Sequence, residues 1–268
     1  MFANARMYSL NPELSAAWRR LLQWVIDRAA VDGEVIDYPA PQPLPALWAR
    51  DDMACAFICG YPLARMRPQP WVLAAPVPSP ARYAGQPVYC TDLVVRAESR
   101  IATLADAWGQ RMAYTTPDSM SGYQAPRRFF APHAAARGGK LFAASVGPLL
   151  TPRGVVDALL AGQADLGPLD SYAHDLLRRH EPQIAARLRV VASTPFTPIP
   201  PLVGAAGIDP AVAQRLSAAL LEVDGAAELA PTRAALLLHG FARISASGYH
   251  ANMAAADETD ALGYPQLI

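Results

Sequence analysis

The sequence predicts an α/β fold in which mostly parallel strands are covered by helices. Between about Leu93 and Val191, short apolar runs alternate with segments whose apolar residues recur at helical spacing. Such alternation favours a mostly parallel sheet with helices on its faces. The chain has 268 residues, 52% of them hydrophobic, which is enough for one large or two ordinary cores.

The first ninety residues predict similar strand and helix units. A short strand from Ala5 to Leu10 precedes a helix with Asn11 as N-cap and Pro12 at its first position. "MACAFICGYP" has the composition of a buried strand that ends near Tyr61, and "PWVLAAPV" and "PVYCTDLVVR" predict further strands. The sheet thus begins well before the regular alternation does.

The later elements follow in order. "TLADAWGQ" predicts a short helix starting near Thr103, and "RMAYT", "LFAAS", "ADLGPLD" and "LRVVAS" predict strands. One helix starts at Thr151 and Pro152, and another runs from Asp170 to about Arg179. "DPAVAQRLSAALLEV" and "PTRAALLLHGF" predict helices that return to the sheet begun by residues 1–90.

The stretch "PDSMSGYQAPRRFF" carries more polar turn residues than one helix start requires. Ser121 as N-cap and Gln124 three residues later have the spacing of a capping box. Ser119 is then surplus, and Gly122 allows close approach to the backbone at the positive end of a helix. Taken alone, the stretch fits an anion-binding turn and a purely structural turn with surplus polar residues equally well.

Two further strand-to-helix junctions carry polar caps, at Thr151-Pro152 and at Asp170 to Tyr172. In open α/β sheets such junctions gather at the carboxyl ends of the strands, where ligands bind. The three junctions together therefore favour a binding site.

Charge and residue spacing exclude several other functions. The 23 basic and 23 acidic residues cancel and form no basic run, which argues against nucleic acid or an anionic membrane surface as partner. The three cysteines match no zinc spacing and are expected to be buried free thiols. The five histidines show no H-x-x-x-H pattern, and glycine patterns for dinucleotides or a P-loop are missing. We therefore expect neither metal nor cofactor.

No apolar run approaches the ~20 residues that cross a bilayer, so we expect no membrane span. The N-terminus "MFANARMYSLNPEL" lacks a basic region followed by an apolar core. This predicts a cytoplasmic protein if the sequence is full length, and a periplasmic one if a signal peptide was trimmed.

Several segments resemble, in order and spacing, the phosphonate-type substrate-binding proteins of ABC transporters. They are "CGYP", "VYCTDLVVR", "TLADAWGQRMAYTTPDSMSGYQAPRRFF" and "LLAGQADLGPLDS", within roughly residues 50–200. The most specific element is Ser119-x-Ser121-Gly122-Tyr123 followed by Pro126, together with the later Ala164-Asp165 and Asp170-Ser171.

The resemblance implies a two-lobed type 2 periplasmic-binding-protein fold, each lobe a mixed, mostly parallel sheet flanked by helices, which closes over a small ligand. Lobe 1 would comprise residues 1–91 and 191–268, and lobe 2 residues 92–190. The hinges would lie near residues 89–93 and 189–194.

The resemblance also implies a set of ligand contacts. Tyr61 and Tyr89 would face the cleft, an oxyanion would bind at the serine-rich turn, and Asp170 would accept a hydrogen bond from the ligand. Where the family often has Gly-Ser-His before a helix, this chain has Leu150-Thr151-Pro152, so the histidine donor is missing and a hydroxyl is kept. The expected ligand-binding residues are Tyr61, Tyr89, Ser119, Ser121, Gly122, Tyr123, Thr151 and Asp170.

Two functions are weighed. The first is non-catalytic binding of a small oxyanion-bearing solute such as a phosphonate or phosphate ester, with an ABC permease as possible partner. The alternative is a hydrolase or biosynthetic enzyme on the same fold that uses Ser121 or Asp170. No G-x-S-x-G elbow is found, which disfavours a serine hydrolase. Without the resemblance, Tyr61 fits a packing residue at a turn and Asp170 a simple helix cap.

Overall fold

A computed structural model describes residues 1–268 except the side chain at position 255, and the chain divides into two compact units. Unit 1 consists of Met1–Val88 and Pro198–Tyr249, and unit 2 of Tyr89–Thr197 and His250–Ile268. The sequence-based division placed the whole of residues 191–268 with lobe 1. The structure differs, because its last nineteen residues pack within unit 2.

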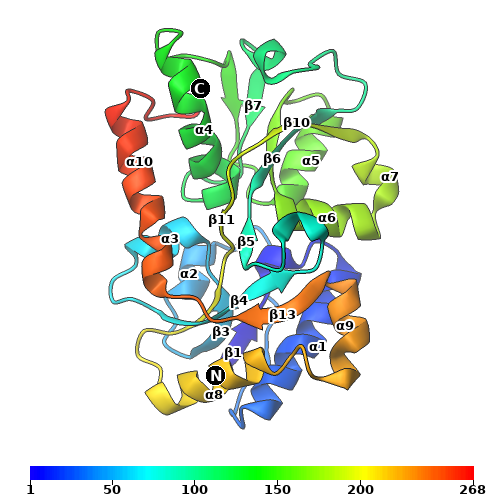
Figure 1. The fold of residues 1–268 in the computed structure, drawn as a ribbon, viewed down its shortest axis with the longest axis vertical. Coiled ribbons are helices and arrows are strands. Elements are labelled where there is room, and N and C mark those ends of the chain that lie inside the picture. Colours follow the sequence, from blue (N-terminus) through cyan, green and yellow to red (C-terminus); the bar gives the residue numbers. More distant parts are fainter. The chain divides into compact units, whose positions relative to one another are not determined.

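Unit 1 is built on a six-stranded sheet in the order β13-β4-β12-β3-β1-β2. Strand β1 is parallel to β2 and β3, whereas β12 is antiparallel to β3 and β4, and β13 to β4. Helices α1, α8 and α9 pack beside one another (Figure 1). The strands are β1 (Phe2–Asn4), β2 (Glu34–Val35), β3 (Met53–Phe57), β4 (Trp71–Pro78), β12 (Leu202–Gly204) and β13 (Leu238–Ala242). The α-helices are α1 (Pro12–Arg28), α2 (Leu44–Trp48), α3 (Gly60–Arg65), α8 (Pro210–Leu221) and α9 (Ala230–Ala235). The 3₁₀ helices are η1 (Arg6–Tyr8), η2 (Ala81–Tyr83), η5 (Ala227–Leu229) and η6 (Ala246–Tyr249).

Local sequence explains the start of α1. The Asn11 side chain accepts a hydrogen bond from the Leu14 amide at 2.9 Å, and Pro12 opens the helix, which confirms the predicted cap. The first strand was misplaced, because the chain is extended at Phe2–Asn4 and then forms a 3₁₀ turn. The Asn4 carboxamide oxygen accepts from the Arg6 amide at 2.9 Å and so turns the chain away from the sheet.

Unit 2 contains a three-stranded antiparallel sheet in the order β10-β6-β9 and a parallel pair, β7 and β8. Antiparallel pairing is more frequent than the strand and helix alternation predicts. The reason is that β6 follows the chain's entry into the unit and β10 precedes its exit, so these two neighbours run in opposite directions. The strands are β6 (Thr91–Arg96), β7 (Arg111–Ala113), β8 (Ala144–Val146), β9 (Gly167–Asp170) and β10 (Leu188–Ser193). The helices are η3 (Leu104–Ala107), the π-turn η4 (Met120–Gln124), α4 (Ala125–Ala135), α5 (Pro152–Leu160), α6 (Ser171–His180), α7 (Pro182–Ala185) and α10 (Ala251–Ala261). Two of the three unit boundaries fall inside β5 (Val88–Tyr89) and β11 (Thr197–Pro198), and the third lies between Tyr249 and His250.

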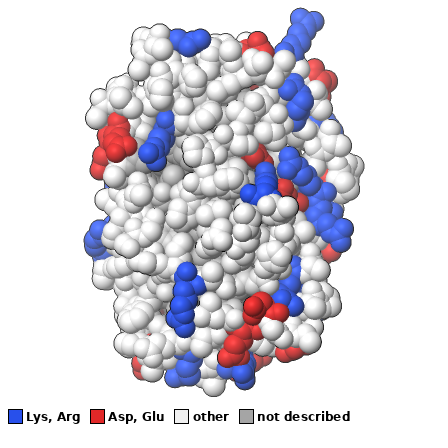
Figure 2. All heavy atoms as spheres, viewed as in Figure 1, with Lys and Arg blue, Asp and Glu red and all other residues white. Residues whose placement is uncertain are grey.

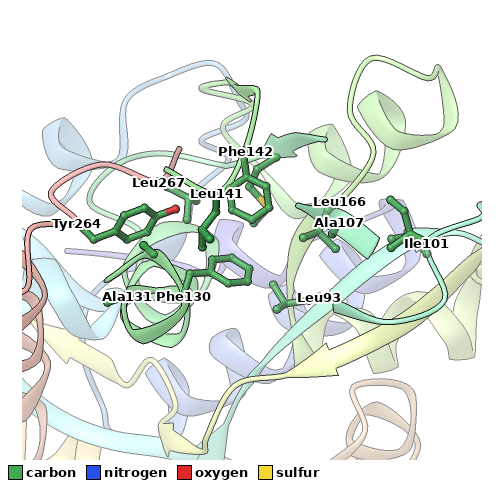
Figure 3. Packing of buried hydrophobic residues seen from close by; sticks show 13 residues of the cluster. Leu93, Ile101, Ala107, Phe130, Ala131, Leu141, Phe142, Leu166, Tyr264 and Leu267 are labelled. Carbon is green, nitrogen blue, oxygen red and sulfur yellow. The ribbon is translucent and has the colours of Figure 1, made fainter. Parts of the chain in front are cut away.

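One core of unit 2 packs α4 against β6, β7 and the end of the chain. Phe130 is fully buried and meets the Trp108 and Phe142 rings edge-on, with centroids 5.9 and 5.1 Å away. Tyr264 and Leu267 of the C-terminal segment insert their side chains into the same cluster (Figure 3). Helix α10 accordingly lies along α4 (Figure 1).

A clamp between Arg111 and Asp165 joins the start of β7 to the approach of β9. The Asp165 carboxylate accepts from the Arg111 backbone amide at 3.1 Å and from its guanidinium at 2.8 and 2.9 Å. These hydrogen bonds hold the pKa of Asp165 below its ordinary value, and those from the guanidinium have the largest effect. The carboxylate therefore stabilises the fold in its charged form.

Charged side chains of both signs interleave over the face seen in Figure 2, which fits the formal net charge of zero. Among the described residues, every helix is too short or too polar to cross a bilayer.

We expect Asp165→Asn to lower the free energy of unfolding at pH 7 by about 1–2 kcal/mol, because hydrogen bonds to a charged group are lost at a half-exposed partner. Since the folded pKa is depressed, this contribution is present above the unfolded pKa of about 3.9 and disappears as the pH falls through the folded value. Urea unfolding of both proteins between pH 7 and pH 2.5 measures the difference. Glu98→Gln, which removes the exposed partner of Arg96, serves as control and should change little. A difference that stays constant with pH would contradict the assignment.

Phe130→Ala should lower the free energy of unfolding by about 3–5 kcal/mol, because the cavity left in a fully buried aromatic cluster collapses only in part. The neighbouring half-buried Phe129→Ala should cost less. Urea midpoints of the two variants test the order, and equal losses would show that α4 is not anchored through Phe130.

Candidate functional site

The turn before α4 is capped by Ser119. Its hydroxyl accepts from the Gly122 amide at 3.0 Å, and its backbone is extended, with φ −71° and ψ 128°. The predicted cap at Ser121 was wrong, because the chain first forms a wide π-turn, which moves the cap two residues upstream. Gln124 makes no capping box. Its side-chain amide donates instead to the Pro117 carbonyl at 2.7 Å.

Gly122 is required by close contact with Thr115. A Cβ at this position would lie 1.9 Å from the Thr115 Oγ1 and 2.9 Å from the Ser119 Oγ. Thr115 is 6% exposed, and its amide donates to the Gly122 carbonyl at 3.3 Å. Within the described part of the chain its Oγ1 has no hydrogen-bond partner. Sequence reasoning missed this residue, whose only signal was a hydroxyl at the end of a predicted strand.

Thr91 connects the turn to Asp170. Its hydroxyl donates to the Ser121 carbonyl at 2.9 Å, and across β6 and β9 it is the register partner of Asp170. Thr91 is 1% exposed, so the hydroxyl is held in place by packing. No local sequence pattern indicates this role, since the partner lies thirty residues away.

Asp170 caps α6. One carboxylate oxygen accepts from the Tyr172 and Ala173 amides at 2.9 and 3.0 Å, which confirms the cap. The start of α6 is held further by Ser171, whose hydroxyl accepts from the Cys90 amide at 3.0 Å. One turn on, His174 Nδ1 lies 2.8 Å from the buried Asp92 carboxylate.

Thr151 caps α5 as predicted, with its hydroxyl accepting from the Gly154 amide at 3.0 Å and Pro152 in the first turn. The preceding loop is bonded to the end of β7, since Leu149 and Leu150 donate to the Tyr114 and Thr115 carbonyls, each at 3.1 Å. Leu150 has φ +65° and is 42% exposed. It stands where the family resemblance implies glycine, the residue that adopts this left-handed backbone most readily.

These contacts bring the starts of three helices together. Helix α4 follows β7, α5 follows β8 and α6 follows β9, and their caps are joined through Thr91 and Thr115. Each helix start carries partial positive charge on its first amides, so the arrangement suits a small oxyanion. Asp170 adds a carboxylate to the same group.

The three predicted tyrosines have separate surroundings. Tyr61 belongs to α3 of unit 1, where its hydroxyl accepts from Arg65 at 2.9 Å. Tyr89 is fully buried at the end of β5. The Tyr123 hydroxyl accepts from the Leu267 amide at 3.2 Å and so serves the C-terminal segment. Within unit 2, the structure brings together the predicted residues of the three helix starts, Ser119, Ser121, Gly122, Thr151 and Asp170.

Within the described residues no group of three histidine, cysteine or acidic side chains is placed to hold a metal ion. The three cysteines are free and buried, as predicted, and burial raises the pKa of the Cys55 thiol.

Helix starts gathered at strand ends in an α/β unit form an arrangement that suits the binding of small anionic solutes. The family model for the periplasmic substrate-binding proteins of phosphonate ABC transporters matches residues 11–249, and the chain belongs to this family. A search of curated proteins finds no significant match.

Solved structures confirm the type 2 periplasmic-binding-protein fold at low sequence identity. A binding protein component of an ABC phosphonate transporter from Pseudomonas aeruginosa is 17% identical, with a TM-score of 0.74 over 98% of this chain and 96% of that one. PhnD1 from Prochlorococcus marinus, in complex with methylphosphonate, is 15% identical, with a TM-score of 0.76 over 97% and 98%. The alkanesulfonate-binding protein SsuA from Xanthomonas axonopodis pv. citri, bound to MOPS, is 19% identical, with a TM-score of 0.59 over 97% and 92%.

We expect Gly122→Ala to destabilise the protein by about 1–3 kcal/mol, because the new methyl group overlaps the Thr115 side chain and the turn must shift. Gly207→Ala, where a Cβ meets nothing within 4 Å, is the matched control. Thermal and urea unfolding measure both. Equal stability of the two variants would mean that the Thr115 contact does not fix the turn.

Proposed function

We propose that this protein binds a small solute carrying an oxyanion, such as a phosphonate or phosphate ester, at the three helix starts of unit 2. The observation that carries the proposal is the joining of the Ser119–Gly122, Thr151 and Asp170 caps through Thr91 and Thr115. Family membership supports it, as do the methylphosphonate and MOPS named for two proteins of the same fold. Ser119, Ser121 and Gly122 would hold the oxyanion.

The ligand should also carry a hydrogen-bond donor. Pro152 stands where the family often has a histidine, and the neighbouring Thr151 supplies a hydroxyl but no charge. A doubly charged phosphonate would therefore lose a charge-assisted hydrogen bond of about 1.5–3 kcal/mol. Asp170 opposes a purely anionic ligand unless a donor lies beside it. An oxyanion at one end of the ligand would bind at the helix starts, and an amine or ring N–H at the other end would offset the charge of the Asp170 carboxylate.

We further propose that binding is not followed by turnover and that an ABC permease receives the solute. Ser121 and Asp170 are the candidate catalytic groups, but the Asp170 carboxylate already accepts hydrogen bonds from the first amides of α6. The family to which the chain belongs is one of substrate-binding proteins of such transporters.

Calorimetric titration with inorganic phosphate, methylphosphonate, 2-aminoethylphosphonate and methanesulfonate tests the proposal. We expect 2-aminoethylphosphonate to bind tightest, and Asp170→Asn to weaken it about tenfold, since a charged acceptor is lost while asparagine still caps the helix. Ser121→Ala should lower the affinity for both phosphonates. Thr103→Ala, which removes a helix cap away from the three starts, should leave affinity unchanged.

Tightest binding of inorganic phosphate, with no effect of Asp170→Asn, would contradict the ligand's polarity. Steady product formation from any of these compounds that is lost in Ser121→Ala would replace the binding function with the enzyme alternative.

A further inference from the structure

Arg127 joins the C-terminal segment, residues 250–268, to the first turn of α4. Its side chain is 4% exposed. One terminal nitrogen donates to the Asp260 carboxylate and to the Pro265 carbonyl, the latter at 3.0 Å. The other donates to the Gln124 side-chain oxygen at 2.8 Å and to the Ala256 carbonyl at 3.3 Å. A buried guanidinium thus holds both helices at once.

Gln124 carries this connection into the serine-rich turn. Its oxygen accepts from Arg127, and its side-chain nitrogen donates to the Pro117 carbonyl, two residues before the cap. Its backbone amide donates to the Ser119 carbonyl at 3.0 Å. Gln124 is buried, so these bonds face little competition from water.

The end of the segment is fixed independently. The Leu267 amide donates to the Tyr123 hydroxyl, its carbonyl accepts from the Ser145 hydroxyl, and the Ile268 carbonyl accepts from the Leu141 amide at 3.1 Å. Tyr264 and Leu267 are buried in the aromatic cluster around Phe130 (Figure 3). The segment is therefore anchored on both sides of α4 and before β8.

We propose that the C-terminal segment is a brace that positions the Ser119–Gly122 turn, with Arg127 and Gln124 as positioning residues. The consequence for affinity rests on the proposed function of that turn. Amide and hydroxyl donors hold an oxyanion well only when their directions are set beforehand, because ordering a loose turn during binding lowers affinity. Gln124 and Arg127 of the serine-rich stretch therefore hold the turn in position and do not contact the solute.

Gln124→Glu is the sharpest test. It keeps an oxygen for Arg127 and removes the donor to the Pro117 carbonyl, so the brace stays docked but loses its hold on the turn. Asp260→Asn is the second variant, because its carboxylate is half exposed and its loss weakens the anchor itself. Arg128→Gln is the matched control. This neighbouring arginine is exposed, and its guanidinium lies 3.9 Å from the exposed Glu258 carboxylate of α10.

Two measurements separate the brace from the binding function. Hydrogen exchange of the Gly122 and Gln124 amides in the unliganded protein reports on the turn, and calorimetry with 2-aminoethylphosphonate reports on affinity. We expect about fivefold faster exchange and about fivefold weaker binding in Gln124→Glu, smaller changes in the same direction in Asp260→Asn, and neither in Arg128→Gln.

Exchange at wild-type rates in both test variants would overturn the brace. Faster exchange with unchanged affinity would overturn its positioning role. If the wild-type protein binds none of the four probes, the proposed function fails, and the exchange data alone still decide whether the segment holds the turn.

Discussion

The hydrogen bond from the Thr91 hydroxyl to the Ser121 carbonyl is the contact on which the candidate site depends. Thr91 belongs to β6, the central strand of its sheet, with β10 on one side and β9 on the other. The β6 and β9 register sets Asp170 opposite the same residue. One buried residue therefore fixes two helix starts relative to each other, through its hydroxyl and through its backbone register. Leaving the Ser121 carbonyl unpaired would cost about 1–3 kcal/mol.

The three caps solve a problem of local stability and create the chemistry of the site at the same time. Each helix start has amides without intrahelical partners, and Ser119, Thr151 and Asp170 each satisfy one or two of them. Two of the caps are neutral, so the positive ends of α4 and α5 stay available to an anion. The third is a carboxylate, which stabilises α6 and would repel an anion bound at these helix starts. For that reason the ligand that we propose also carries a hydrogen-bond donor and is not a bare dianion.

The parts of the structure that sequence reasoning reached are those set by neighbouring residues. Asn11, Thr151 and Asp170 cap the helices that follow them, because capping needs only an amide two or three residues away. The cap before α4 was assigned to Ser121 instead of Ser119, because residue spacing does not distinguish a π-turn from a regular helix start. The roles of Thr91 and Thr115 depend on partners brought near by the sheet, and no local pattern carries that information.

The placement of residues 250–268 shows the same limit at a larger scale. The predicted division followed the family resemblance, which lies mainly within residues 50–200 and says nothing about where a final helix docks. Its docking is decided by Tyr264 and Leu267, whose burial beside Phe130 is a hydrophobic gain, and by Asp260, which meets a buried guanidinium. Neither contact can be recognised from the sequence, because both depend on the tertiary packing around α4.

Arg127 explains why a cation so close in sequence to the serine-rich turn does not itself serve an oxyanion. A buried guanidinium is tolerated only when it is compensated, and its terminal nitrogens are directed to Asp260, to the Pro265 and Ala256 carbonyls and to Gln124. Redirecting it toward a solute would leave those acceptors unpaired, which would cost more than a single new charge-assisted bond supplies. The turn must therefore rely on neutral donors, and for neutral donors direction matters more than charge. Arg127 therefore affects the turn by setting the directions of its neutral donors, and it does not bind the solute itself.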